Sequence, residues 1–566
     1  MKLIGARIIW ESLLREGVDV VFGIPGGRII LTYHVLPEYP IRHILMRHEQ
    51  AAAHAADGYA RATGKVGVCF ATSGPGATNL VTGIAAASMD SSPIVAITGQ
   101  VGTDVIGKDA FQETDITGIT LPITKHNYLV TDVRDLAGVI KEAFHIARTG
   151  RPGPVLIDVP RDVQATETEF EYPKEVNLPG YRPTLEGNVR QIRQAARLIN
   201  EAERPVIVAG HGIILSGAQA ELQELAVKTQ TPVVTTLLGI SCVSESHSLC
   251  LGMLGMHGEV CANMAVQDAD LVIAIGMRFD DRVTSDIPSF APKARIVHID
   301  IDPSEIGKNV RVDVPIVGDA RNVLRELNKL VEPADRREWL ERIESWRAES
   351  CAGDILFQEQ EKLVAPYVIQ QICEIGGKDA IVVSDVGQNQ MWEAQYWCHD
   401  KLNSLISSGG LGTMGFALPA SIGVKVGRPQ ETVWVIAGDG GFQMTIQELA
   451  TLVQDDIAVK IAIINNGYLG MVRQWQEFFF ERRYSATRIT GPDFVKIAEA
   501  YGIPGFCVTE RSQVAPAIEQ AMAYSGPALI DFRVEPEENV YPMVCPGAPI
   551  SEMLRRPIQT KEVSDL

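Results

Sequence analysis

The sequence lacks the marks of a secreted or membrane protein. Its nine cysteines include no CxxC pair and show no regular spacing, so we expect a reducing compartment. No apolar run approaches the roughly 20 residues that cross a bilayer. The stretch from Ile4 to Leu14 is apolar and periodic, with too few basic residues and no cleavage-like site for a targeting peptide. We therefore expect a cytoplasmic protein.

Positive charge is also in deficit. The chain carries 51 Lys and Arg against 70 Asp and Glu, a formal net charge of −19. Nucleic acids and anionic membranes are bound mainly through clustered Lys and Arg, so we expect neither as a partner. Small anions remain compatible with this balance, because a few local cations, a helix N-terminus or a metal suffice to bind a phosphate or carboxylate.

No low-complexity tract interrupts the chain, and 566 residues are too many for one hydrophobic core. Short β-rich runs alternate with helical patterns, which predicts an α/β fold. The runs fall into three blocks of similar size, so we expect three doubly wound parallel-sheet domains. The expected divisions are a first domain at 1–165, a linker from Gln164 to Asn188, a second domain at 190–330, a connecting segment from Glu332 to Gln360, a third domain at 365–535 and a tail at 536–566.

Two apolar strand patterns in the third block run directly into oxygen-bearing turns. The run Val433–Ala437 leads into Gly438–Gly441, which contains Asp439, and the run Lys460–Ile464 leads into Asn465-Asn466-Gly467. Carboxylate, carboxamide and backbone oxygens suit Mg²⁺, and the glycines let a diphosphate approach the backbone. Asp-Gly and Asn-Gly pairs are also the commonest turn sequences, so each motif alone is compatible with a simple turn.

A carboxyl group in the first block is a candidate proton shuttle. Glu49 follows the apolar run Ile44–Met46 and opens a helix of small residues, Ala51–Ala62. A lone Glu in the first turn of a helix is otherwise a surface residue favoured by the helix dipole. The choice between these interpretations depends on the surrounding motifs.

Together these motifs resemble one family along essentially the entire chain. Further motifs that carry the resemblance are Ser73–Asn79, Gly107–Glu113, Leu254–Gly258, Gly276–Arg282, Asp385–Trp392, Leu411–Gly415, Gly470–Gln476 and Asn539–Ala548. They resemble the catalytic subunits of thiamine-diphosphate-dependent acetolactate synthases. Each has a plainer structural interpretation: a surface loop for 107–113, a solvated charge cluster for 278–282, and core packing for Met414 and Trp475.

The resemblance implies a pyrimidine-binding first domain, a central FAD-binding domain and a third domain that binds diphosphate and Mg²⁺. It implies decarboxylation of one pyruvate and joining of the two-carbon unit to a second pyruvate or to 2-ketobutyrate, in branched-chain amino acid biosynthesis. The implied cofactors are thiamine diphosphate, Mg²⁺ and a structural FAD. The implied assembly is a homodimer or tetramer with active sites at the subunit interface, and a small regulatory subunit.

The resemblance also implies roles for individual residues. Glu49 is the acid that activates the cofactor, with Phe111 and Gln112 beside the reacting centre. The other implied sites are metal ligands at Asp439, Asn466 and the Tyr468 carbonyl; thiamine diphosphate contacts at Gly387, Gln388, Asn389, Gly412, Met414, Gly440 and Gly441; FAD contacts at Arg151, Met256, His257, Gly276, Arg278, Asp280 and Asp300; and a substrate pocket at Gly26, Gly27, Arg28, Met471, Trp475 and Arg282.

Four positions depart from the family pattern. Asn389 stands where His is usual, Arg161 where Lys is usual and Cys545 where Pro is usual. Arg28 replaces a small residue near the substrate channel, so we expect a narrower channel or a changed sensitivity to inhibitors. Three alternatives stay open: a pyruvate-oxidase-like flavin oxidoreductase, another thiamine-diphosphate 2-ketoacid decarboxylase or carboligase, and a cofactor-binding protein without turnover.

Overall fold

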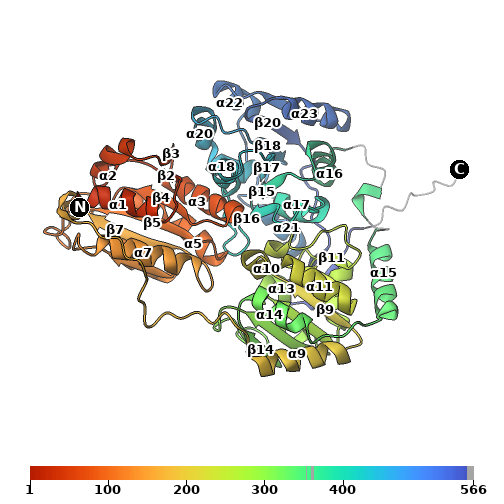
Figure 1. Ribbon diagram of the computed structural model, residues 1–566. Coiled ribbons are helices and arrows are strands. Elements are labelled where there is room, and N and C mark those ends of the chain that lie inside the picture. The colour runs from red at the N-terminus through yellow and green to blue at the C-terminus, as the bar shows by residue number, and fades with distance from the viewer. Residues whose placement is uncertain (352–353, 358–361, 558–566) are drawn as a thin grey trace.

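The computed structural model describes residues 1–351, 354–357 and 362–557. It contains three six-stranded sheets in which every pairing is parallel, so the α/β prediction with three parallel sheets is confirmed. We call the parts built on them the N-terminal, central and C-terminal domains (Figure 1). Their exact limits stay a prediction. Parts of the expected connecting segment (352–353 and 358–360) and tail (558–566) lie outside the described residues.

The N-terminal and C-terminal sheets share one topology. Numbered within its own domain, each has the strand order 2-1-3-4-6-5, whereas the central sheet has the order 3-2-1-4-5-6. The first sheet consists of β3 (Arg42–Leu45), β2 (Val20–Gly23), β4 (Gly67–Ala71), β5 (Ile94–Gln100), β7 (Val155–Pro160) and β6 (His126–Leu129). The last consists of β16 (Leu405–Ser407), β15 (Ile381–Ser384), β17 (Val433–Gly438), β18 (Lys460–Asn465), β20 (Ala528–Arg533) and β19 (Gly505–Val508).

The central sheet consists of β11 (Cys250–Met253), β10 (Val233–Thr235), β9 (Pro205–Ala209), β12 (Leu271–Ile275), β13 (Arg295–Asp300) and β14 (Val314–Val317). The main helices are α1 (Gly5–Arg15), α3 (Glu49–Thr63), α5 (Val81–Met89), α7 (Leu136–Arg148), α9 (Val189–Glu201), α11 (Gln219–Thr229), α12 (Val260–Asp268), α14 (Ala320–Asn328), α15 (Arg337–Cys351), α16 (Ala365–Gly376), α17 (Gln388–Tyr396), α18 (Ala417–Gly427), α21 (Gly470–Phe479) and α23 (Arg511–Ala523).

Both faces of each sheet are covered, as doubly wound folds require. In β17, Val433 and Val435 pack into one core cluster, while Trp434 and Ile436 pack into another on the opposite face. The strands are therefore apolar at successive positions, which is typical of buried parallel sheets. Among the described helices, none is long and apolar enough to span a bilayer.

Helices α3 and α18 join the N-terminal and C-terminal domains within one chain (Figure 1). A Cβ placed on Gly423 of α18 would lie 1.8 Å from the Ala55 carbonyl oxygen, and one on Gly58 of α3 would lie 2.1 Å from that of Ala420. Only glycine permits this approach. The alanines of α3 favour a helix and leave room for the neighbouring backbone, so one core cluster extends across both domains.

Two stretches expected to be plain connections form short strands. Within the expected linker, β8 (Glu167–Glu169) pairs antiparallel with β1 (Lys2–Ile4). Within the expected tail, β21 (Met543–Val544) pairs with β22 (Met553–Leu554). The tail also packs on the central domain, because the Val544 N–H donates to the Met256 carbonyl at 2.8 Å.

Candidate functional site

The end of β17 presents a buried carboxylate without a partner. Asp439 is 1% exposed, and no described residue donates a well-aligned hydrogen bond to either of its carboxylate oxygens. Burial raises the pKa of this group to about 7, partly opposed by nearby backbone N–H groups. A buried carboxylate without partners is costly, and a bound cation relieves that cost. The donor set at Asp439 therefore fits a metal ion.

The end of β18, the neighbouring strand, supplies neutral oxygens beside Asp439. Asn466 is 8% exposed, and its carboxamide oxygen accepts the Tyr468 N–H at 3.1 Å. Its amide nitrogen donates to Gln388 Oε1 at 3.1 Å, which ties the metal-ligand candidates to the start of α17. Among the described residues, no group of three or more His, Cys, Asp or Glu side chains forms a metal cluster. One carboxylate with neutral oxygens suits Mg²⁺ shared with a diphosphate.

The loop after β15 carries the predicted diphosphate contacts. Gly387 has a φ of 145°, a backbone conformation that favours glycine, and it immediately precedes α17. Gly441 is constrained differently, since a Cβ there would lie 2.4 Å from Asp385 Oδ1. Helix α17 thus begins at the carboxyl edge of the sheet, and the N-terminus of a helix suits an anion.

Asn389, which departs from the family pattern, directs its amide nitrogen into the chain. It donates to the main-chain carbonyls of Asp385 at 2.8 Å and Ile436 at 3.2 Å, so it links the ends of β15 and β17. A Cβ placed on Gly387 would lie 2.9 Å from the Asn389 oxygen. The Asn389 atom nearest to Gly387 is therefore its carboxamide oxygen, which accepts hydrogen bonds. A role for Asn389 as a hydrogen-bond donor to the cofactor stays a prediction.

Met414 belongs to the loop after β16, and its side chain approaches the turn that follows β17. A Cβ placed on Gly440 would lie 3.6 Å from Met414 Cε. Gly412 has a φ of 71°, a backbone conformation that favours glycine, and it is exposed. The structure thus brings Gly412, Met414, Gly440 and Asp439 to one edge of the C-terminal sheet.

Glu49 begins α3 at the corresponding edge of the N-terminal sheet. Its carboxylate accepts a hydrogen bond from Asn79 Nδ2 at 2.9 Å, and the side chain is half-buried. His48 caps the helix, because its ring nitrogen accepts the Gln50 N–H at 3.1 Å. A Cβ on Gly76 would lie 3.2 Å from the other Glu49 oxygen, so the glycine leaves that oxygen accessible.

The other predicted N-terminal residues lie in loops that contact one another. The Gly74 backbone packs on Gln112, since a Cβ on Gly74 would lie 2.9 Å from the Gln112 carbonyl oxygen. Gln112 has a φ of 62°, and Phe111 is 79% exposed. Arg28 donates to the Phe111 carbonyl at 3.4 Å. Gly26 and Gly27 precede Arg28 in the loop that follows β2.

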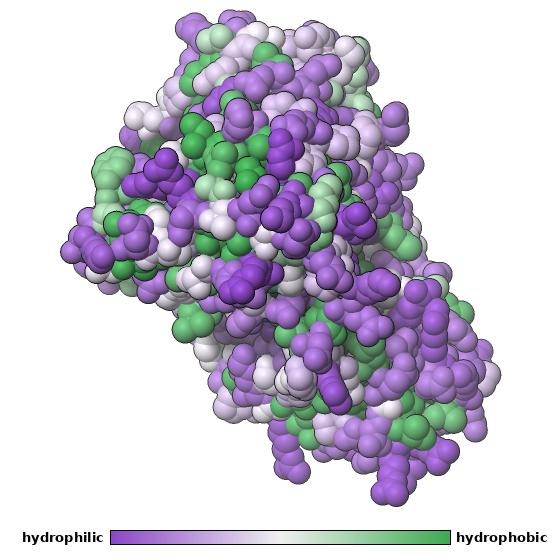
Figure 2. Space-filling view, turned by 60° about the vertical axis from the view of Figure 1, so that its left-hand side comes forward, coloured by the Kyte–Doolittle hydropathy of each residue, from purple (hydrophilic) through white to green (hydrophobic). Residues whose placement is uncertain are grey.

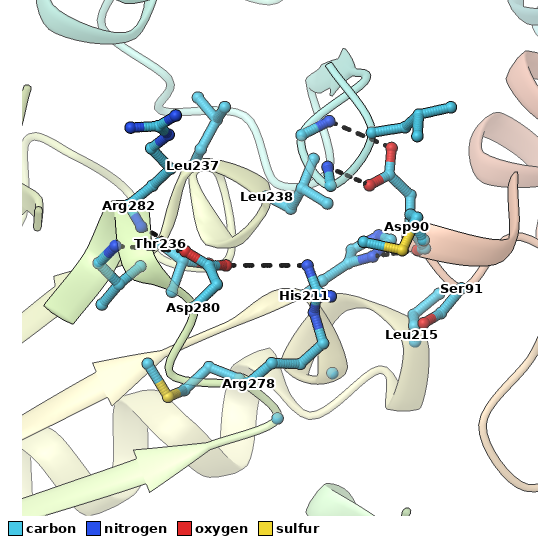
Figure 3. A pocket seen from close by; sticks show the side chains of 18 of the residues that line it. Asp90, Ser91, His211, Leu215, Thr236, Leu237, Leu238, Arg278, Asp280 and Arg282 are labelled. Atoms are coloured by element: carbon cyan, nitrogen blue, oxygen red, sulfur yellow. Dashed lines mark hydrogen bonds and ion pairs between the residues drawn. The ribbon is translucent and has the colours of Figure 1, made fainter. Parts of the chain in front are cut away.

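A cavity of about 1030 Å³ lies where the three domains meet. Figure 3 shows Asp90 and Ser91 on one side of it and Arg278 and Asp280 on the other, with the His211 ring against the Asp90 carbonyl. Thirteen of the residues singled out from the sequence line this cavity: Arg151, Met256, His257, Gly276, Arg278, Asp280, Arg282, Asp300, Gly387, Gly412, Met414, Met471 and Trp475. The predicted FAD contacts therefore share one space with part of the predicted thiamine loop.

The charges in this cavity are already partly paired. Arg151 lies 2.7 Å from Glu305 and 3.3 Å from Asp302, and Arg278 lies 3.7 Å from Asp280. Burial lowers the pKa of His257 to about 4 and raises that of Asp300 to about 6. At neutral pH His257 is uncharged, so among the predicted FAD contacts positive charge comes from Arg151 and Arg278.

The predicted residues form two separate groups within the chain. The first, which we call the acid group, is Gly26–Arg28, Glu49, Phe111 and Gln112. The second, the metal group, is Gly387–Asn389, Gly412, Met414, Asp439–Gly441, Asn466 and Tyr468. No hydrogen bond or ion pair among the described residues joins them. Both lie at the carboxyl ends of parallel strands, where ligands bind in open α/β sheets.

Several cavity residues were not singled out from the sequence. Thr236 follows β10, so the same search of strand ends would have found it. His211 opens α10 (His211–Ser216) just after β9 ends, so it carries the same signal, whereas Asp90 ends helix α5 and carries none. Only the fold brings them together, through a hydrogen bond of 2.9 Å from the His211 ring to the Asp90 carbonyl.

Comparison with known proteins identifies the family. Models of the thiamine pyrophosphate enzyme N-terminal TPP binding domain, central domain and C-terminal TPP binding domain match residues 4–119, 192–327 and 385–532. The acetolactate synthase large subunit of Corynebacterium glutamicum is 50% identical over 98% of this chain and 90% of its own length. That of Mycobacterium tuberculosis is 50% identical over 98% and 91%. A probable acetolactate synthase large subunit of Methanocaldococcus jannaschii is 49% identical over 97% and 95%. The chain therefore belongs to the acetolactate synthase large subunits of the thiamine pyrophosphate enzyme family.

Proposed function

We propose that this chain decarboxylates pyruvate and joins the two-carbon unit to a second pyruvate or to 2-ketobutyrate. The products are 2-acetolactate and 2-aceto-2-hydroxybutyrate, precursors of branched-chain amino acids. Besides the family, the observation that carries the proposal is the buried, unpartnered carboxylate of Asp439 beside Asn466. That arrangement suits Mg²⁺ bound together with the diphosphate of thiamine diphosphate.

Each group of residues has a defined task in this proposal. Asp439, Asn466 and the Tyr468 carbonyl hold the metal, and the glycines of the metal group accommodate the diphosphate. Thiamine diphosphate, when bound, supplies the electron sink for decarboxylation. Glu49 exchanges a proton with N1′ of the aminopyrimidine ring, and Asn79 holds its carboxylate in place. Gln112 lies near the oxygen of the substrate that develops negative charge.

The two groups meet, in this proposal, across a homodimer. The acid group of one subunit faces the metal group of the other, because neither is closed within one chain. Large apolar side chains around both groups are exposed: Phe111 by 79%, Met444 by 54%, Val472 by 50% and Leu411 by 44%. Figure 2 shows hydrophobic side chains gathered as a patch on the upper lobe of one face. A patch of this kind is typical of a subunit interface. A tetramer and a small regulatory subunit are further family expectations.

The cavity where the domains meet is the proposed FAD site. Its volume of about 1030 Å³ lies just above the range of roughly 300–1,000 Å³ found for pockets that hold drug-sized ligands. Arg151 and Arg278 supply the positive charge for the FAD diphosphate. The flavin is a structural group in this proposal, whereas a pyruvate-oxidase-like enzyme would reduce it during turnover.

An activity assay tests the proposal. The protein is mixed with pyruvate, Mg²⁺, thiamine diphosphate and FAD, and acetolactate and CO₂ are measured together with flavin absorbance. Acetolactate formation without flavin bleaching supports the proposal. Bleaching coupled to turnover supports the pyruvate-oxidase-like alternative. If no CO₂ is released, both the proposed activity and the other enzymatic alternatives are wrong. Glu49→Gln should lower turnover by about 10²–10⁴-fold, as loss of a general acid–base group does. Glu38→Gln is the control, since Glu38 pairs with Arg7 on the surface.

A further inference from the structure

The turn after α5 places a buried carboxylate at the junction of the domains. Asp90 is 2% exposed and ends helix α5, and Ser91 follows with a φ of 61°. The Ser92 N–H donates to the Ala87 carbonyl at 2.8 Å, which closes the turn in the manner of a helix C-cap. A non-glycine residue at positive φ is uncommon, so the surroundings hold this turn in a specific conformation.

The Asp90 carboxylate binds the backbone of the loop that carries Gly412 and Met414. Its two oxygens accept the Gly410 N–H at 2.6 Å and the Gly409 N–H at 3.1 Å (Figure 3). These contacts connect the N-terminal domain to the C-terminal domain of the same chain. They fix the position at which the loop leaves β16.

A second buried aspartate binds the other end of the same loop. Asp385 accepts the Gly415 N–H and the Ala417 N–H, each at 3.0 Å. Between the loop positions that the two aspartates bind lie Leu411 and Gly412, which are exposed, and Met414, which is half-buried. The loop is thus fixed at both ends, with its middle part directed toward the site.

Local stability does not account for Asp90. A negative charge at the C-terminus of a helix opposes the helix dipole. Arg61, at the end of α3, offsets this charge at 2.8 Å and also donates to the Ser407 carbonyl at 2.8 Å. Arg61 has a second partner in Asp57 at 2.7 Å, so its charge is neutralised without Asp90. What Asp90 alone provides is the pair of bonds to Gly409 and Gly410.

We propose that Asp90 is a positioning residue: it holds the 409–414 loop in the conformation that receives thiamine diphosphate. This inference rests on the proposed function, because it assigns Gly412 and Met414 to the cofactor. It also connects the two sites of a dimer. Helix α3 carries Glu49 at its start and the Arg61 contact with Asp90 at its end, so one helix supports the acid group of one site and the thiamine loop of the other.

Two variants test the contact from opposite sides. Asp90→Asn keeps the shape but replaces one acceptor oxygen with a donor group that faces the loop N–H groups, while Asp57 still pairs with Arg61. Gly410→Ala leaves the ion pair intact, and its Cβ would lie 2.8 Å from Asp90 Oδ1, which displaces the loop. The control is Arg428→Gln. Arg428 donates to the Ala62 carbonyl at 2.6 Å, so this variant removes another contact between the same two domains, away from the loop.

The readouts include two that do not depend on turnover. Hydrogen exchange of peptides covering 405–416 is measured without cofactor, and thiamine diphosphate binding with Mg²⁺ is measured by calorimetry. Asp90→Asn and Gly410→Ala should speed exchange in these peptides and weaken binding about tenfold or more, the loss expected for charge-assisted hydrogen bonds. The KM for pyruvate should change little, because the loop contacts the cofactor. Arg428→Gln should leave exchange and binding as in the unaltered chain.

Two outcomes would overturn the inference. One is unchanged thiamine diphosphate affinity in Asp90→Asn and Gly410→Ala although hydrogen exchange in their 405–416 peptides is faster. The other is equally weakened binding in Arg428→Gln, which would make Asp90 one of several general domain contacts. If the unaltered chain binds thiamine diphosphate but forms no acetolactate, the proposed function fails while the binding comparison still decides the role of Asp90.

Discussion

The guanidinium carbon of Arg282 lies 5.8 Å from the centroid of the Trp475 ring, in a cation–π contact between two domains. Arg282 comes from the central domain, where it also donates to the Met256 sulfur at 3.5 Å. Trp475 comes from α21 of the C-terminal domain and is half-buried. Together they form one wall of the cavity beside Met471, at the proposed position of the second ketoacid.

Replacing Trp475 should change product choice. Trp475→Leu removes the aromatic surface proposed to contact the extra methyl group of 2-ketobutyrate. One such contact is worth roughly 1–3 kcal/mol, so the preference for 2-ketobutyrate over pyruvate should fall by about tenfold. The measurement is the ratio of the two products when both ketoacids are present. Trp346→Leu is a matched control, because Trp346 forms a cation–π contact with Arg342 on α15 at 5.2 Å, outside the cavity. An unchanged ratio in Trp475→Leu would contradict the assignment.

Removal of the metal should weaken cofactor binding through Asp439. Asp439→Asn keeps the shape and loses the charge that the metal needs, so Mg²⁺ should no longer raise thiamine diphosphate affinity. The expected loss is about tenfold or more, equal to that caused by chelating the metal in the unaltered chain. Calorimetry with and without Mg²⁺ measures both.

Asp531→Asn is the control for this charge. Asp531 is also buried in the C-terminal sheet, but its oxygens accept from Asn465 at 2.8 Å and Arg533 at 3.3 Å. If Mg²⁺ still raises the thiamine diphosphate affinity of Asp439→Asn, or no longer raises that of Asp531→Asn, the metal binds elsewhere.

Titration of the Glu448 carboxyl group should make the stability of the folded chain depend on pH. Its carboxylate accepts the Arg47 N–H at 3.1 Å and the Thr451 hydroxyl at 2.7 Å, where the C-terminal domain meets the start of α3. Burial raises the pKa of Glu448 from its ordinary 4.5 to about 7. The folded chain therefore retains a proton that the unfolded chain has released between these values. Stability should fall as the pH rises through this window, by at most about 1.4 kcal/mol per pH unit.

Glu448→Gln lacks this titration and isolates it. The difference in melting temperature, variant minus unaltered chain, should increase between about pH 5 and pH 7.5 and then level off. A difference that stays constant across this range would mean that Glu448 does not titrate there.

The sequence predicted the parts of the site that depend on local pattern. The apolar runs before Asp439 and Asn466 became β17 and β18, and adjacent parallel strands brought their ends together. The position of Asp90 could not be predicted, because its bonds to Gly409 and Gly410 join residues far apart in the chain. The strand order shared by the first and last sheets could not be predicted from the sequence either, because it is set by pairings between distant segments.

The occupant of the cavity should stabilise the turn at Asp90. Arg151 Nε donates to the Ser91 hydroxyl at 2.9 Å, and the His211 ring donates to the Asp90 carbonyl, so both residues join the cavity wall to this turn. FAD binding should therefore slow hydrogen exchange in peptides covering 86–92. At a hundredfold excess over its dissociation constant it should also add about 2.7 kcal/mol of stability.

Arg151→Gln should weaken both effects, because it removes a proposed diphosphate contact and the bond to Ser91. Arg295→Gln is the control, since Arg295 begins β13 whereas Asp300, at the other end of that strand, lines the cavity. If FAD stabilises the chain but leaves exchange at 86–92 unchanged, the flavin binds without contact to this turn.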